Sequence, residues 1–254
     1  MTLAEILLLA GAGFLAGTAN AVVGGGTFFT FPMLLSVGLP PVIANATSTV
    51  ALWPGTVTAS TIYLPELKKV RNGLPLRIVV AVAGGVTGAL LLLSSSNVFF
   101  FMLVPWLLAV ATLLFAFSGP IVKRISGFAK GHPVHTVLPF VLEFLSAVYG
   151  GYFGAGLGVL LMSSLALAGH SDTQNANAQK NLLAAGINGV AAALFVIVGA
   201  VRWLAAVAVM VGAIAGGFTG AHAARLIPAH WLRVIVIAAG TGFSAYYFVQ
   251  AYGG

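Results

Sequence analysis

The sequence has no cysteine and little charge. Without thiols, the chain can form no disulfide, no thiol-based catalytic site and no thiolate metal site. Charged residues make up only 6% of the chain, with four acids and eleven bases among 254 residues. A soluble domain carries roughly 25% charged residues, so this composition cannot cover a water-exposed surface. The 60% hydrophobic content therefore predicts an integral membrane protein.

The hydrophobic stretches are continuous, which favours membrane helices over a transmembrane β-barrel. Barrel strands alternate hydrophobic and polar residues with a period of two, unlike the runs in this sequence. Breaks at Gly, Pro and basic residues predict helical segments at about 3–23, 27–37, 42–64, 76–93, 98–117, 134–150, 157–168, 175–201, 203–224 and 231–251. The N-terminal segment is hydrophobic like a signal peptide, but it carries Glu5 and no base, so we interpret it as a membrane helix.

The two halves of the chain share motifs in the same order. Three segments return 130 to 132 positions later, in the pairs Gly24–Gly26 and Gly154–Gly156, Ala44–Ala46 and Ala176–Ala178, and Ala83–Ala89 and Ala215–Ala221. Such pairs are typical of transporters built from two structural repeats with the substrate site between them. We expect the first repeat at residues 1–118, a cytoplasmic connecting loop at 119–133 and the second repeat at 134–254.

Each half opens with a helix that breaks at glycine, followed by a segment too short to span a bilayer comfortably, 27–37 or 157–168. Irregular backbone at membrane depth is tolerated only where protein or a cavity surrounds it. We therefore expect a helical hairpin whose Gly-rich tip faces an internal site. If the opening helix and the short segment each cross the membrane, each half crosses it an odd number of times and the two repeats are inverted. If the two segments together form one broken helix, the repeats are parallel.

The basic residues favour inverted repeats with both termini outside the cytoplasm, because short cytoplasmic loops carry the excess of Lys and Arg. In that topology Arg202 lies outside, and the cytoplasmic side holds Lys68, Lys69, Arg71, Arg77, Lys123, Arg124, Lys130, Arg225 and Arg233. The predicted fold class is thus an all-α integral membrane protein with two inverted repeats. Each repeat is a Gly-broken helical hairpin followed by three transmembrane helices.

A polar stripe opens the same helix in both halves. Asn45, Ser48 and Thr49 are spaced i, i+3 and i+4, so they share one helix face. The repeat partners of these residues are Asn177, Lys180 and Asn181, and Thr47 corresponds to Gln179. Helix N-termini carry free N–H groups and a positive dipole end, so two stripes that converge near mid-membrane would form a cradle for an anion. Lys180 adds a cation to this cradle.

The same residues have structural interpretations. Ser, Thr and Asn often bond a neighbouring membrane helix, and Asn45 and Asn177 could be helix caps. Lys180 could extend to the cytoplasmic surface. The glycine breaks permit close backbone approach to a substrate or simply tight helix packing. The substrate-binding residues that we predict are Gly24, Gly25, Gly26, Asn45, Thr47, Ser48, Gly154, Gly156, Asn177, Gln179, Lys180 and Asn181. The duplicated segments 83–89 and 215–221 are interpreted as packing faces.

Glu143 is the one acid well inside a predicted span. An intramembrane carboxylate is a functional hypothesis by default, and proton coupling is the natural role. Its counterpart in the first repeat is Gly13, so it breaks the symmetry. The alternative is a neutral, hydrogen-bonded Glu with a structural role. His132 and His135 have no partner acids at metal-ligand spacing, so no metal site is expected.

These motifs resemble the TauE/SafE sulfite exporter family. The resemblance rests on the glycines at 24–26, then Pro32, the run Gly38–Pro41 and the run Ala44–Ser48, with a weaker second copy. It implies a bacterial-type inner-membrane transporter that moves sulfite, thiosulfate or organosulfonates, coupled to the proton gradient. The second copy departs from the pattern, since it lacks a Pro opposite Pro32 and has Gln179 and Lys180 where Thr47 and Ser48 stand.

We therefore predict a secondary transporter that works by alternating access around a site between the repeats. An anion channel, or a carrier of a small organic anion without sulfur, remains the alternative. An enzyme is not expected, because no nucleophile–base pair, nucleotide loop or metal-ligand cluster is evident. We expect no cofactor and no nucleic acid partner. The expected partners are a small anionic substrate and the lipid bilayer, with room for a homodimer.

Overall fold

The computed structural model describes residues 1–22, 25–67, 73–131, 137–168, 173–223 and 229–253. The secondary-structure elements of this part of the chain are helices, which confirms the predicted all-α class. The first half contains α1 (Leu3–Val22), α2 (Thr27–Ser36), α3 (Pro41–Ile62), α4 (Leu64–Leu67), α5 (Leu74–Ser94) and α6 (Asn97–Ala116). The rest contains α7 (Ser118–Gly131), α8 (Leu138–Tyr152), α9 (Leu157–Leu167), α10 (Thr173–Ile197), α11 (Trp203–Ala223) and α12 (Ala229–Tyr252).

Several of these helices have the length and composition of membrane spans. Among the described residues, five segments are long and apolar enough to cross a bilayer: Leu3–Asn20, Leu74–Ser94, Asn97–Ala116, Gln174–Ile197 and Arg233–Tyr252. The helices α2 and α9 are apolar but shorter, as the sequence predicted. They cannot span a bilayer alone, because a crossing takes about 20 helical residues.

The predicted glycine breaks are confirmed. The helix α1 ends at Val22 and α2 begins at Thr27, while α8 ends at Tyr152 and α9 begins at Leu157. Gly25 has φ 92° and Gly154 has φ 83°, in the left-handed region that residues with a Cβ rarely adopt. Glycine therefore makes both reversals possible.

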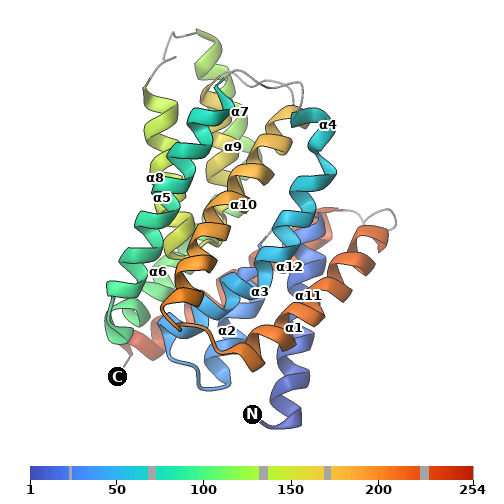
Figure 1. Cartoon of the computed structure of the whole chain (residues 1–254), viewed down its shortest axis with the longest axis vertical. Coiled ribbons are helices and arrows are strands. Elements are labelled where there is room, and N and C mark those ends of the chain that lie inside the picture. Colours follow the sequence, from blue (N-terminus) through green and yellow to red (C-terminus); the bar gives the residue numbers. More distant parts are fainter. Residues whose placement is uncertain (23–24, 68–72, 132–136, 169–172, 224–228, 254) are drawn as a thin grey trace.

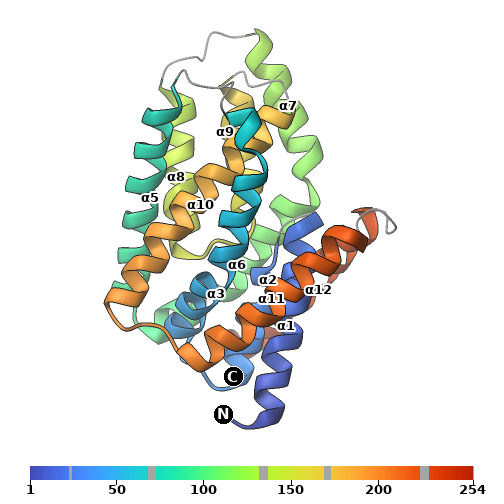
Figure 2. The ribbon, with the colours of Figure 1, turned by 45° about the vertical axis from the view of Figure 1, so that its right-hand side comes forward.

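The helices run lengthwise through the molecule, and both termini lie at the same end (Figure 1). The helix α1 begins at the end with the termini, α2 turns back, and α3 then runs to the opposite end. The helix α8 begins at that opposite end, so α8, α9 and α10 follow the same path in the reverse direction (Figure 2).

The duplicated glycine-rich segments are packing faces, which confirms the interpretation from the sequence. They lie on α5 and α11; α5 packs against α8 and α11 packs against α1, so each contact joins the two halves. A Cβ on Gly216 of α11 would collide with the carbonyl oxygen of Phe14, and one on Gly88 of α5 with that of Val148. The absence of side chains at these positions lets the helix backbones touch.

The stretch between the halves differs from the predicted connecting loop. Most of the predicted loop, residues 119–131, belongs to the helix α7, which follows α6 towards the end opposite the termini (Figure 2). The helix is amphipathic: Ile121 and Ile125 are half-buried, whereas Lys123 and Arg124 are exposed. Basic residues that are typical of a cytoplasmic loop are also typical of the polar face of an amphipathic helix at the membrane surface.

Two further basic residues that were assigned to the cytoplasmic side also lie within helices. Arg77 is part of α5 and is buried, and Arg233 is part of α12. Arg233 donates to the carbonyl oxygens of Phe115 and Ala116, 3.0 and 3.1 Å away, at the end of α6. A guanidinium suits this place because the C-terminal carbonyls of a helix lack intrahelical partners. The predicted loop residues Lys68, Lys69, Arg71 and Arg225 lie outside the described residues.

Candidate functional site

Asn45 links the first polar stripe to the glycine break of the second half. It is the fifth residue of α3 and 1% exposed, so it is a buried helix residue and not a cap. Its side-chain amide donates to the carbonyl oxygen of Tyr152, 2.9 Å away, where α8 ends. The side-chain oxygen of Asn45 is buried and has no hydrogen-bond partner in the described part of the chain. An acceptor of this kind is costly to bury and can be satisfied by a ligand that donates a hydrogen bond.

The neighbouring hydroxyls of the first stripe bond other parts of the protein. The Ser48 and Thr30 hydroxyl oxygens lie 2.6 Å apart and join α3 to α2. The Thr47 hydroxyl accepts from the backbone N–H of Arg202, 3.1 Å away, before α11. Thr47 and Ser48 are both buried, so they hold elements together in the way expected of hydroxyls between membrane helices.

The two polar stripes do not converge, which corrects the prediction. The helices α3 and α10 pack against each other and run in opposite directions (Figure 1). They meet at Trp53, whose indole N–H donates to the carbonyl oxygen of Ala185, 3.1 Å away. Asn45 and Asn177 each lie eight residues before this contact, about 12 Å along their own helix. Because the helices are antiparallel, the two stripes lie on opposite sides of the crossing.

The second stripe places a cation beside the short helix α9. The Lys180 ammonium donates to the side-chain oxygen of Asn177, 3.2 Å away. The Lys180 stem lies over Gly158, and a Cβ on that glycine would sit 3.7 Å from the Lys180 Cδ atom. Gln179 is buried and Asn181 is half-buried on the same helix. The ammonium thus turns towards the start of α10 while its stem borders the first turn of α9.

The glycine break of the first half is closed by side chains. The Asn20 side-chain oxygen accepts from the backbone N–H of Gly26, 2.8 Å away, immediately before α2. Phe28 then follows in the first turn of α2; it is fully buried and its ring meets that of Phe115 edge-on. Gly25 packs beside Val236 and Phe28. Gly24 lies outside the described residues.

The equivalent positions of the second half carry small residues. Gly150 stands opposite Asn20 and Gly158 stands opposite Phe28, at an offset of 130. The helix α9 starts after Gly156, which has φ 78° and no side-chain cap. Lys180 occupies the space next to Gly158. Among the predicted residues, the structure therefore groups Gly154, Gly156 and Lys180 around the start of α9, and the matching break of the first half is filled.

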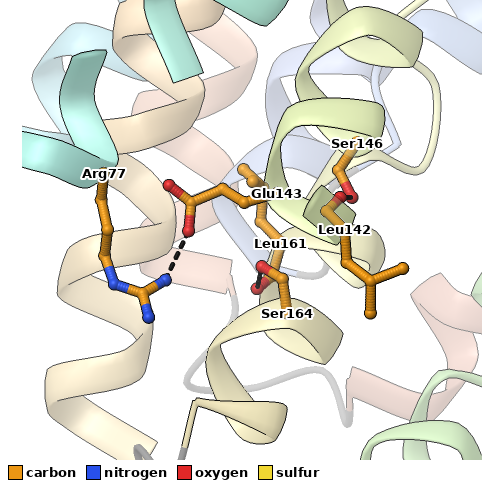
Figure 3. A network of polar contacts seen from close by, with 6 residues as sticks. All are labelled: Arg77, Leu142, Glu143, Ser146, Leu161 and Ser164. Atoms are coloured by element: carbon orange, nitrogen blue, oxygen red, sulfur yellow. Dashed lines mark hydrogen bonds and ion pairs between the residues drawn. The ribbon is translucent and has the colours of Figure 1, made fainter. Parts of the chain in front are cut away.

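Glu143 forms an ion pair that the sequence did not reveal. It is fully buried in α8, and its Oε2 atom accepts from Arg77 of α5 (Figure 3). Arg77 is 5% exposed and also lies over the ring of Phe140, 5.2 Å from its centroid. The sequence held one signal of this pair: Arg77 follows two apolar residues and Pro75, inside a span, and an unpaired charge is costly there.

A cavity of about 910 Å³ lies between α1, α2 and α12 and is lined by apolar side chains such as Phe14 and Phe243. Another, of about 450 Å³, lies between α5, α6 and α8 and includes Tyr149 and Tyr152. Neither is lined by a predicted substrate-binding residue. Within the described chain, no three His, Asp or Glu residues gather as a metal site would require.

Comparison with known proteins identifies the family. The family model for the sulfite exporter TauE/SafE matches residues 9–247. The chain belongs to the TauE/SafE sulfite exporter family. This assignment, together with the apolar helices, makes it a multi-pass membrane protein of a transporter family and not of an enzyme class.

Three relatives support the assignment. A probable membrane transporter protein of Haemophilus influenzae is 27% identical over 215 residues, covering 82% of this chain and 81% of the relative. The probable membrane transporter protein ORF9 of a Sinorhizobium species is 27% identical over 229 residues, covering 89% and 85%. The probable membrane transporter protein YfcA of Escherichia coli K12 is 25% identical over 242 residues, covering 94% and 88%. No solved structure matches the chain.

Proposed function

We propose that this protein is a secondary transporter of small sulfur-containing anions, such as sulfite, thiosulfate or organosulfonates, across the inner membrane. Membership of the sulfite exporter family supports this class of substrate. The observation that carries the proposal is Lys180, whose stem lies over Gly158 in the first turn of α9. A cation beside the N-terminal end of a helix is suited to an anion, since the helix end adds a positive partial charge.

The proposed site lies at the second glycine break. Lys180 and Asn177 supply polar groups beside the first turn of α9, which follows Gly154 and Gly156 in their left-handed conformation. The first-half break serves as structural support in this proposal.

Alternating access follows from two inverted repeats, residues 1–118 and 134–254, that move against each other. The opposite starting ends of α1 and α8 support inversion (Figure 1). The paired inter-half contacts, α1 with α11 and α5 with α8, support a pseudo-two-fold relationship. Transport is coupled to protons through Glu143, an acid buried between the halves.

Ligand-induced stabilisation tests the substrate class and the site together. Sulfite, thiosulfate and a small alkylsulfonate should each raise the melting temperature of purified protein, and acetate should not, because a ligand of the folded state stabilises it. Lys180→Gln should abolish the shift. Lys123→Gln is the matched control, because it removes the same charge from an exposed position on α7. Equal shifts in Lys180→Gln and the wild type would reject this site.

Transport in proteoliposomes distinguishes a carrier from a channel. With an imposed pH gradient, a proton-coupled carrier accumulates sulfite against its own concentration gradient. A channel only lets the concentrations equalise. Failure to accumulate sulfite, thiosulfate or an alkylsulfonate under either direction of the pH gradient would reject coupled transport.

A further inference from the structure

The Arg77–Glu143 pair joins the two halves of the protein. Arg77 is the fourth residue of α5 in the first half, and Glu143 is the sixth residue of α8 in the second. Both are buried, yet the only bond of the carboxylate to another described residue is the one to Arg77, and its Oε1 atom has no partner among these residues. Buried ion pairs stabilise a fold only when their remaining acceptor sites are also satisfied. This pair is therefore poorly explained as a static support.

The symmetry-related crossing works without such a pair. Glu143 corresponds to Gly13 on α1, and Arg77 corresponds to Val209 on α11. A Cβ on Gly13 would collide with the carbonyl oxygen of Val209, so these helices meet backbone to backbone. The same fold thus packs one inter-half crossing closely without an ion pair between these two positions. The charges on the other crossing require an explanation beyond packing.

The groups around Glu143 leave Arg77 as its described partner. On α8, the Ser146 hydroxyl donates to the carbonyl oxygen of Leu142, and on α9 the Ser164 hydroxyl donates to that of Leu161 (Figure 3). The helix α9 contains no titratable residue. The titratable group on the described face of α10 is Lys180, which bonds Asn177 and lies over Gly158. On α5, Arg77 is the only charged residue.

We propose that Arg77 is the positioning residue of proton coupling, and that Arg77 and Glu143 form a proton-operated latch between the halves. The biological role of this latch rests on the proposed transport function, but the stability experiment that tests the latch needs no substrate. With Glu143 ionised, the guanidinium holds α5 against α8. A proton that enters from the aqueous phase, at the end of the molecule where α5 and α8 begin, then binds the unpartnered Oε1 atom of Glu143. The carboxyl becomes neutral, Arg77 keeps its charge, and the attraction between the helices is lost.

The latch gives the two halves unequal inter-half contacts. The glycine crossing of α1 and α11 is indifferent to protons, whereas the crossing of α5 and α8 loosens when Glu143 is protonated. A proton therefore favours one arrangement of the halves over the other, which is what coupling requires, since a ligand shifts only an equilibrium whose states it distinguishes.

A double-mutant cycle on purified protein tests the latch without any substrate. Removing one partner leaves a buried, uncompensated charge, so R77Q and E143Q should each lower the melting temperature more than R77Q/E143Q does. The melting temperature of the wild type should change with pH across the titration of Glu143, whereas R77Q/E143Q should show no such change because it lacks the carboxyl group. Additive single effects, or a wild-type pH profile retained in the double variant, would overturn the latch.

Arg233→Gln is the matched control for this cycle. Arg233 is a partly buried arginine that bonds the neutral carbonyls of Phe115 and Ala116 and the hydroxyl of Ser118. Its loss should lower the melting temperature at every pH without changing the pH profile. The control thus separates general loss of packing from loss of the titrating pair.

Transport then separates failure of the latch from failure of the proposed function. One proton moved per anion lets a one-unit pH gradient sustain roughly tenfold accumulation, and in E143Q and R77Q this should fall to about onefold. Exchange of external for internal sulfite should persist in both, and R77K should restore part of the accumulation. R77Q that accumulates like the wild type would overturn the role of Arg77. Absence of sulfite flux in the wild type, with the stability cycle intact, would reject the proposed substrate and leave the latch standing.

Discussion

Trp53 donates its indole N–H to the carbonyl oxygen of Ala185, and these two residues occupy the same position in the two halves, 132 residues apart. In the inverted arrangement that we propose, a contact between equivalent positions lies on the pseudo-two-fold axis that relates the two repeats. The α3–α10 contact would then lie on this axis, and equivalent motifs on these two antiparallel helices would lie on opposite sides of it.

Trp53→Phe should lower the free energy of unfolding by about 1–2 kcal/mol, because it removes the hydrogen bond and leaves space beside Gly189. The measurement is thermal or denaturant unfolding of purified protein. Trp106→Phe is the matched control, since Trp106 is 55% exposed and bonds Tyr252 at the surface. A larger loss in Trp106→Phe than in Trp53→Phe would contradict a central role for this contact.

The cysteine-free sequence allows a direct test of topology. We expect Arg202→Cys to react with a membrane-impermeant maleimide in intact cells, and Lys123→Cys to react only after the membrane is opened. Both positions are exposed, so accessibility to water is not limited by burial. Labelling of both residues from outside would exclude the proposed orientation.

Gly216→Val should prevent stable folding, with a cost of about 3 kcal/mol or more, because its Cβ would overlap the Phe14 backbone and no rotamer can relieve that overlap. Folded yield after detergent extraction measures the effect. Gly11→Val on the partner helix α1 is the control, since a Cβ there meets nothing within 4 Å. Normal yield of Gly216→Val would mean that α1 and α11 do not pack as described.

The sequence predicted the parts of the fold that depend on local composition. The lengths of the apolar runs predicted the helices. The glycines predicted the breaks at Gly25 and Gly154, because few other residues adopt the left-handed backbone conformation found there. The sequence could not predict that Arg77 meets Glu143, since the two residues are 66 positions apart and carry no local signal of contact. The prediction that the two polar stripes converge was wrong, because a repeat in the sequence does not show how its two copies are oriented in space.

The difference between the two glycine breaks predicts which one binds substrate. Gly158→Leu should abolish sulfite-induced stabilisation, because its branches would displace the Lys180 stem, while Gly158→Ala should retain it, since the added Cβ sits at an ordinary 3.7 Å from Lys180. Asn20→Ala should cost about 1 kcal/mol of stability through the lost bond to Gly26, yet leave the sulfite-induced shift intact. The thermal shift of each variant with and without sulfite provides the measurement. If Asn20→Ala loses the shift and Gly158→Leu keeps it, the anion binds in the first half and the second-half site is wrong.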